Sequence, residues 1–188
     1  MNTEDGETEQ RGIVIVPLGV DVSARDRAEL AELLMACVGS GASIGFLAPL
    51  APAEADAYWE KTFGDLSGGF RVLLVVREEA DGVIIGSAQL ACESRANGRH
   101  RAEVQKVMVR PSHRRRGIAA RLMHEIERVA RSRGVTLLFL DTGDSHSGAR
   151  QLYETTGYVY VGGIPGYALD PRGTPEKNAI FYKTLASP

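Results

Sequence analysis

The stretch from Val104 to Ile126, VQKVMVRPSHRRRGIAARLMHEI, constrains the fold of this chain more than any other. It begins as an apolar run of β-preferring residues, which Pro111 closes. It then continues with apolar residues at helical spacing: Ile118, Ala119, Leu122, Met123, Ile126, Val129 and Ala130. This pattern predicts a buried strand that turns almost directly into an amphipathic helix.

Three consecutive arginines, Arg114, Arg115 and Arg116, lead into the start of that helix. Cations oppose the helix dipole at this end, and the N–H groups of the first turn have no partner within the helix. A bound anion resolves both difficulties, and phosphate is the natural candidate because backbone donors and the dipole converge on it. Gly117 would let the backbone approach such a ligand closely. The alternative is a solvated basic turn between a core strand and a helix.

The composition narrows the class of protein. At 188 residues and 44% hydrophobic, the chain is long enough for one globular core. A formal net charge of −2 argues against a general nucleic-acid binder, which would be markedly basic. Two cysteines are too few for a disulfide framework, and the scattered histidines show no zinc spacing, so we expect no metal. With no apolar run near the ~20 residues that span a bilayer, and no secretory signal, we expect a cytoplasmic protein without a membrane partner.

The chain reads as a polar tail, residues 1–12, expected to be disordered, and a single domain over residues 13–188. The predicted order is strand, two helices, three strands, helix, strand, helix and two strands. Turn signals such as Asn97-Gly98 join consecutive strands antiparallel. The apolar run Val135–Leu140 should lie parallel to the strand that ends at Val109, through a right-handed crossover. We therefore expect an α/β fold with a mixed, mostly antiparallel sheet of about seven strands, helices on both faces and a parallel central pair.

Two helices are predicted between the first and second strands. Ser23 is a candidate N-cap of the first, and Pro52 can occupy the first turn of the second. Tyr58 and Trp59 on the second helix are more typical of core or subunit contacts than of substrate contacts. The glycine-rich segment 39–45 follows a helix rather than a strand, which excludes a dinucleotide loop and favours a flexible loop at the edge of a pocket.

Two motifs connect these features to a known family. Arg114-x-x-Gly117-x-Ala119, on a strand-to-helix turn, resembles the pyrophosphate-binding motif Q/R-x-x-G-x-G/A of the GNAT superfamily of acetyl-CoA-dependent N-acetyltransferases. Residues 149–158, ARQLYETTGY, resemble its second signature, A-x-x-L-Y-x-x-x-G-F/Y. The resemblance implies an enzyme with acetyl-CoA as its cosubstrate. It implies cofactor contacts from Val107, Met108, Val109, Arg114, Arg115, Arg116, Gly117, Ile118, Ala119, Ala120 and His146.

In that family the tyrosine of the second signature lies near the cofactor sulfur and acts as the general acid, and Tyr153 occupies its position. Acetyl transfer from a thioester expels a thiolate, which a phenol at hydrogen-bond distance can protonate. Considered in isolation, Tyr153 would more simply be a packing residue; its place within the motif favours the general acid. The family often has asparagine where this chain has His146, so an asparagine-type cofactor contact is not expected here.

Two carboxylates are candidates for the base that takes the proton of the acceptor amine. Period-two alternation predicts that Glu103 shares a sheet face with Val107 and Val109, and Asp141 follows the next strand. Parallel strands that diverge at their carboxyl ends open a crevice, the usual ligand site in such sheets. The alternatives are a strand-edge carboxylate for Glu103 and a helix cap for Asp141.

Further stretches resemble the members of the superfamily that confer tabtoxin resistance by acetylating a β-lactam amino acid: Arg101–Val109, Leu140–Thr142, Pro165–Tyr167 and Ile180–Leu185. In those enzymes the carboxylates matching Glu103 and Asp141 are the proposed bases. The resemblance implies direct acetylation of the primary amine of a small toxin or antibiotic in a ternary complex, by an enzyme that could be a homodimer. The alternatives are acetylation of protein N-termini or lysines, and a catalytically idle CoA-binding regulatory module. The last has no need of Tyr153 and two carboxylates.

Overall fold

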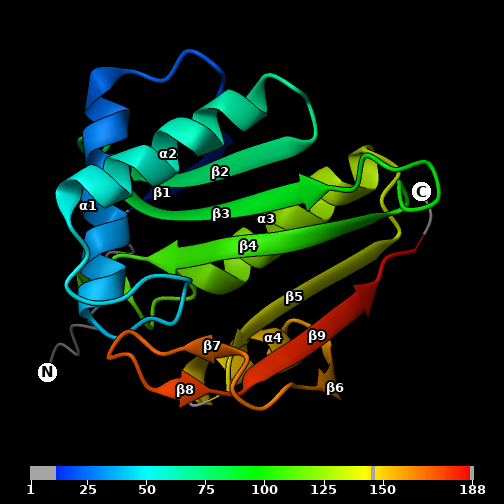
Figure 1. Cartoon of the computed structure of the whole chain (residues 1–188). Coiled ribbons are helices and arrows are strands. Elements are labelled where there is room, and N and C mark those ends of the chain that lie inside the picture. Colours follow the sequence, from blue (N-terminus) through cyan, green and yellow to red (C-terminus); the bar gives the residue numbers. More distant parts are fainter. Residues whose placement is uncertain (1–11, 145–146, 187–188) are drawn as a thin grey trace, which may run out of the picture.

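A seven-stranded sheet in the order β1-β2-β3-β4-β5-β9-β6 organises the computed structural model, which describes residues 12–144 and 147–186 (Figure 1). The strands are β1 (Ile13–Pro17), β2 (Arg71–Glu78), β3 (Ile84–Cys92), β4 (Arg101–Val109), β5 (Leu137–Gly143), β6 (Val159–Gly162) and β9 (Asn178–Thr184). The helices are α1 (Ala24–Gly39), α2 (Pro52–Leu66), α3 (Ile118–Ser132) and α4 (Ser147–Thr155), with a 3₁₀ turn at Pro111–His113. Two short strands, β7 (Ala168–Leu169) and β8 (Pro175–Glu176), pair by themselves.

The predicted fold class is confirmed. Every neighbouring pair in the large sheet is antiparallel except β4 and β5, which run parallel. α1 and α2 cover one face of the sheet, and α3 and α4 lie on the other (Figure 1). The sheet therefore separates two apolar cores, as the alternation of its buried residues requires.

The first two helices form where the sequence predicts them. The Ser23 side chain accepts a hydrogen bond from the Asp26 N–H at 3.1 Å and caps α1, and Pro52 is the first residue of α2. Trp59 is fully buried, and its Nε1–H donates to the Leu30 carbonyl at 2.9 Å. This bond joins α2 to α1 and satisfies the one polar group of the indole.

A β-bulge interrupts β4 at Lys106, whose φ of 50° lies in the left-handed region. Gln105 pairs with Gln89 of β3, but the next recorded partner is Met108, opposite Ser87. β4 therefore holds one residue more than β3 over this span.

The bulge reverses the alternation of β4. Met108 packs in the core under α1 and α2, on the face that Glu103 shares, whereas Val107 and Val109 pack on the α3 side. The prediction that Glu103 shares a face with Val107 and Val109 is therefore wrong. A period of two holds only along an uninterrupted strand, and the extra residue shifts every later side chain to the opposite face.

The parallel pair is short. Only three residues of β4 pair with β5, and the last pair is Glu103 with Phe139. Beyond it β5 follows β9 instead, with which it pairs along its whole length. Asp141 is paired with Ile180 and lies within β5, so the prediction that it follows the strand is corrected. The two strands diverge at their carboxyl ends.

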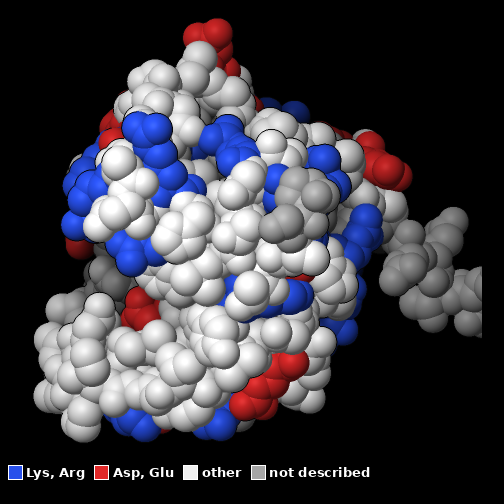
Figure 2. Space-filling model, turned by 90° about the vertical axis from the view of Figure 1, so that its right-hand side faces the viewer, with Lys and Arg blue, Asp and Glu red and all other residues white. Residues whose placement is uncertain are grey.

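At the end of the molecule where β3 turns into β4, basic side chains gather in the upper half of the surface, and the lower half is mostly uncharged (Figure 2). This end lies away from the carboxyl ends of β4 and β5 (Figure 1).

The predicted tail, residues 1–12, falls outside the described residues except for Gly12. Among the described helices, none combines the length and the apolar character that crossing a membrane requires.

A buried ion pair links α3 to β9. Glu127 of α3 accepts from the Lys183 ammonium at 2.6 Å, and its other oxygen lies 3.4 Å from Arg131. Lys183 also donates to the Thr156 carbonyl at 2.7 Å, at the end of α4. Both charges are thus hydrogen-bonded, which is the condition under which a charged pair can be buried.

Replacing Glu127 by alanine should destabilise the fold strongly, because it leaves the partly buried Lys183 ammonium without its counter-charge. We expect a loss of roughly 3–5 kcal/mol in the free energy of unfolding, measured by denaturant titration. Glu125→Ala on the same helix breaks the 2.6 Å pair with the exposed Arg128 and should have a much smaller effect. Equal effects of the two changes would contradict a structural role for the Glu127–Lys183 pair.

Candidate active site

A cleft of about 1050 Å³ opens where β4 and β5 diverge. Its walls come from β4, β5, α4, the turn before α3 and the segment 40–45 after α1. α2 contributes Tyr58 on one side, and Tyr167 and Ala168 contribute on the other. The glycine-rich segment that the sequence associates with a pocket edge therefore does line the cleft.

One end of the cleft is formed by the turn from Arg114 to Ala120. Gly117 is the N-cap of α3 with a φ of 73°, and no side chain caps the N–H groups of the first helical turn. Arg115 also has a positive φ, 61°. Residues in this left-handed conformation turn successive N–H groups toward one side, a geometry that binds anions.

The arginines of this turn differ in what they contact. Arg114 donates from Nη2 to the Ser40 hydroxyl at 2.7 Å and from Nε to the Val109 carbonyl at 3.2 Å. It thus holds the turn against α1 and β4. Arg115 is exposed and lines the cleft, whereas Arg116 does not line it and bonds to the Ser112 carbonyl at 3.4 Å.

The middle of the cleft runs along β4. Beyond Glu103, the edge of β4 that faces β5 has no strand partner within the described residues. Val107, Met108 and Val109 line the cleft there. An unpaired strand edge offers N–H and C=O groups to an extended ligand, as in recognition by strand addition.

Tyr153 of α4 reaches the cleft from the main core. Its ring is buried and packs against Phe181 and Tyr158, with ring centroids 5.4 and 6.1 Å away. Burial raises the pKa of Tyr153 to about 12, and the charge of Asp141 contributes to the shift. The phenol is therefore protonated throughout the neutral range and has a proton to donate until the pH approaches 12.

Glu103 and Asp141 both line the cleft, on the face that α1 and α2 share. Asp141 is exposed and lies 3.5 Å from the Asn178 amide nitrogen. Both carboxylates act electrostatically on Lys106 of β4, which also lines the cleft. The two carboxylates and the tyrosine that the sequence singles out thus border one space.

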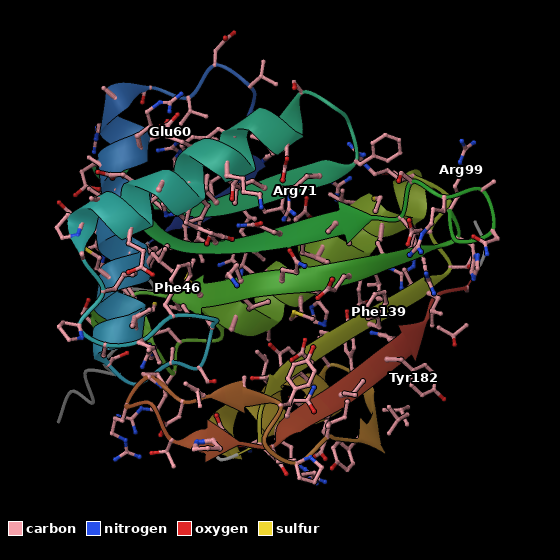
Figure 3. All side chains as sticks on the ribbon, viewed as in Figure 1. Phe46, Glu60, Arg71, Arg99, Phe139 and Tyr182 are labelled. Carbon is pink, nitrogen blue, oxygen red and sulfur yellow. The ribbon has the colours of Figure 1, made fainter. Side chains whose placement is uncertain are left out.

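The side of the cleft next to α2, called the acceptor side below, carries Tyr58 and two polar strand residues, Arg71 and Gln105, that sequence reasoning did not single out. Tyr58 accepts a hydrogen bond from the Gln89 amide at 2.8 Å, and Arg71 donates to Gln89 and Gln105 at 2.6 and 2.9 Å. Phe46 meets Tyr58 edge to face, and Figure 3 shows it in the loop between α1 and α2. The sequence does contain a signal for this cluster, because Arg71, Gln89 and Gln105 are polar residues within strands whose other residues are typical of a core.

Of the predicted site residues, most line this one cleft: Glu103, Val107, Met108, Val109, Arg114, Arg115, Gly117, Ile118, Ala119, Ala120, Asp141 and Tyr153. Arg116 does not, and His146 lies outside the described residues. Trp59 belongs to the core, whereas Tyr58 contacts the cleft. Within residues 12–144 and 147–186, no three His, Cys, Asp or Glu side chains cluster as a metal site requires.

Comparison with known proteins gives consistent results. Residues 30–158 match the family model described as the acetyltransferase (GNAT) family. An Azospirillum brasilense protein named as an uncharacterized N-acetyltransferase of the hisH-hisA intergenic region is 35% identical over 122 residues, which are 64% of this chain and 70% of that protein.

Two solved structures share the fold over nearly the whole chain. An acetyltransferase from Acinetobacter baylyi has a TM-score of 0.78 at 19% identity, with 94% of both chains covered. A phosphinothricin acetyltransferase from Sinorhizobium meliloti, solved in complex with acetyl-CoA, has a TM-score of 0.77 at 19% identity. The match covers 93% of this chain and 89% of that one.

Proposed function

Because the chain belongs to the acetyltransferase (GNAT) family, we propose that it transfers the acetyl group of acetyl-CoA to the primary amine of a small molecule of the toxin or antibiotic class. The observation that carries this proposal is the convergence of Tyr153, Glu103 and Asp141 on the cleft between the diverging strands. A buried neutral phenol and two carboxylates supply the donor and the acceptor of protons that acetyl transfer to an amine requires.

The shape of the cleft fits acetyl-CoA. Its turn at Arg115 and Gly117 offers N–H groups and positive charge to the pyrophosphate. The unpaired edge of β4 offers backbone groups to the extended pantetheine arm. The volume of about 1050 Å³ lies at the upper end of the range of ligand pockets, as a ligand of the size of acetyl-CoA requires.

Acetyl-CoA supplies an activated acyl group as its thioester. The amine nitrogen bonds to the acyl carbon and the carbon–sulfur bond breaks, with Glu103 or Asp141 taking the amine proton directly or through water. Tyr153 donates a hydrogen bond to the departing thiolate. The pKa of Tyr153, about 12, exceeds the ordinary thiol pKa of about 8.5. We therefore infer that Tyr153 chiefly stabilises the negative charge that develops on the sulfur. Any proton transfer from Tyr153 to the sulfur is completed as the amine loses its own proton to Glu103 or Asp141.

Three observations support a small acceptor. Tyr58 and the segment 40–45 border the cleft from one side and Tyr167 from the other, whereas a peptide acceptor needs an open groove. The resemblance to the tabtoxin resistance protein favours a β-lactam amino acid or a related toxin. The Sinorhizobium relative, named for phosphinothricin, is likewise associated with a small amino compound.

The proposed pyrophosphate turn can be tested with two matched glycines. Gly117 and Gly134 lie at opposite ends of α3, both have a φ of 73°, and a Cβ at either meets no atom within 4 Å. Valine at either position should therefore introduce a similar backbone strain. Only Gly117→Val obstructs the anion-binding turn, so we expect CoA affinity, measured by calorimetry, to fall about 10-fold or more in that variant alone. Unchanged affinity in folded Gly117→Val would exclude this turn as the pyrophosphate site.

The proposed activity is tested by screening small amines for acetyl-CoA-dependent thiol release, β-lactam amino acids first. With an acceptor identified, Tyr153→Phe keeps the ring and removes the donor. We expect kcat to fall on the order of 10²-fold with little change in CoA affinity.

Tyr158→Phe is the matched control, because that hydroxyl is also buried, lies outside the cleft lining and has no hydrogen-bond partner among the described residues. Its kcat should stay near that of the wild type. If Tyr153→Phe also turns over at the full rate, Tyr153 is a packing residue. If no amine releases thiol, the proposed function itself is wrong.

The two carboxylates should substitute for each other in part. Glu103→Gln and Asp141→Asn singly leave one base that can work through water, and the double variant leaves none. We expect the double variant to lose far more activity than either single one, and the acidic limb of its kcat/KM profile to move or vanish. The profile is compared for two amines of different basicity. If the acidic limb of the kcat/KM profile shifts with the basicity of the amine and is unchanged by both substitutions, then solvent deprotonates the amine.

A further inference from the structure

Lys106 occupies an unusual position at the centre of the cleft. It is the residue at the β-bulge of β4, and its φ of 50° is one of only two positive values among the described non-glycine residues. Such a conformation is unfavourable for a lysine and persists only where the surrounding structure holds it. The bulge thereby directs the Lys106 side chain into the cleft that it lines.

Two aromatic rings lie near the ammonium, which is partly buried. Its Nζ lies 5.7 Å from the ring centroid of Phe46 and 5.5 Å from that of Tyr58. A Cβ on Gly45 would come within 3.4 Å of it, so the glycine leaves room for the charge. Burial lowers the pKa of Lys106, and the charge of Arg71 lowers it further. The charges of Glu103 and Asp141 have the opposite effect and raise this pKa.

Lys106 differs from the other partly buried cations of the cleft in its partners. Arg71 donates to two glutamine carbonyls, and Lys177 donates to the Tyr160 hydroxyl at 3.1 Å and lies 3.3 Å from Asp144. Lys106 has ring contacts but no hydrogen-bond acceptor among the described residues. An ammonium has three donors, and ring faces do not replace the oxygen ligands that it loses on burial.

We propose that Lys106 binds a carboxylate of the acceptor, which makes the acceptor an amino-acid-like molecule with its amine toward Glu103 and Asp141. This inference rests on the proposed function and names the chemical class of its substrate. Glu103, Asp141 and Lys106 line the same cleft, and both carboxylates act on the charge of Lys106, so the cleft presents both signs of charge to one ligand. A zwitterion whose amine and carboxylate share a carbon matches that arrangement, because each of its charges meets the opposite one.

The test uses two sets of acceptors with the full chain and acetyl-CoA: L-amino acids and the carboxamides of the same amino acids. The two sets differ in the charge that Lys106 would bind. For the wild type we expect kcat/KM to favour the acids. Lys106→Met, of similar length and without charge, should lower kcat/KM for an acid on the order of 30-fold while changing that for its carboxamide about 3-fold or less. Comparing the ratio within each variant cancels the different basicity of the two amines.

Two variants serve as controls. Lys61→Met removes an exposed lysine from the wall of the same cleft and should leave the acid-to-amide ratio unchanged. Lys106→Arg keeps the charge and should retain part of the preference. A structural or general-base role would instead lower the activity of Lys106→Met equally on both sets.

Each outcome decides the matter. Equal losses on both sets, an unchanged ratio in Lys106→Met, or a wild-type preference for amides overturns the inference about Lys106. Acetylation restricted to amines that carry no carboxylate overturns it as well and leaves the proposed function standing. Failure of every amine in the screen, acids and amides included, overturns the proposed function.

Discussion

The divergence of β4 from β5 after Glu103 is the constraint on which the rest of the structure depends. A parallel pair that continued to Val109 would close the sheet and leave no cleft. Two local features keep it open. The extra residue at Lys106 twists β4 away from a regular ladder, and β9 takes the whole length of β5 as its partner.

The same divergence determines the electrostatics of the site. α3 starts at the end of β4, which brings the donors of its first turn to one end of the cleft. α4 starts beyond the end of β5, which brings Tyr153 to the middle. The negative charges on the strands face the acceptor side, and the positive turn faces the opposite end. A ligand with phosphate at one end and a neutral reactive group at the other would bind preferentially in one orientation, with its phosphate at the positive turn.

Much of the fold was predictable because its signals are local. The cap at Ser23, Pro52 at the start of α2 and the apolar run of β5 each follow from short-range sequence patterns, and the structure confirms them. The sequence did not predict that Glu103 lies on the opposite face from Val107 and Val109, because no residue type in β4 is specific for the bulge at Lys106. The extent of β5 past Asp141 depends on a partner strand about forty residues away in sequence, as the Asp141–Ile180 pairing shows. The candidate site was accessible through its two motifs, whereas the places of Lys106 and Arg71 in the cleft required knowledge of which strands and loops meet.

Tyr153 and the acceptor-side residues belong to different cores. Tyr153 packs in the core beneath α3, while Phe46 and Tyr58 pack against the core beneath α1 and α2. A change in the loops and helix that line the acceptor side can therefore be absorbed without repacking the core that positions the phenol. The molecule is in this sense modular: the half that carries the acceptor side can vary while the other keeps Tyr153 in place. Changes at Ala42 and Ile44, which pack on the α1 and α2 side and leave the Ser40–Arg114 bond intact, are the natural route to altered acceptor specificity.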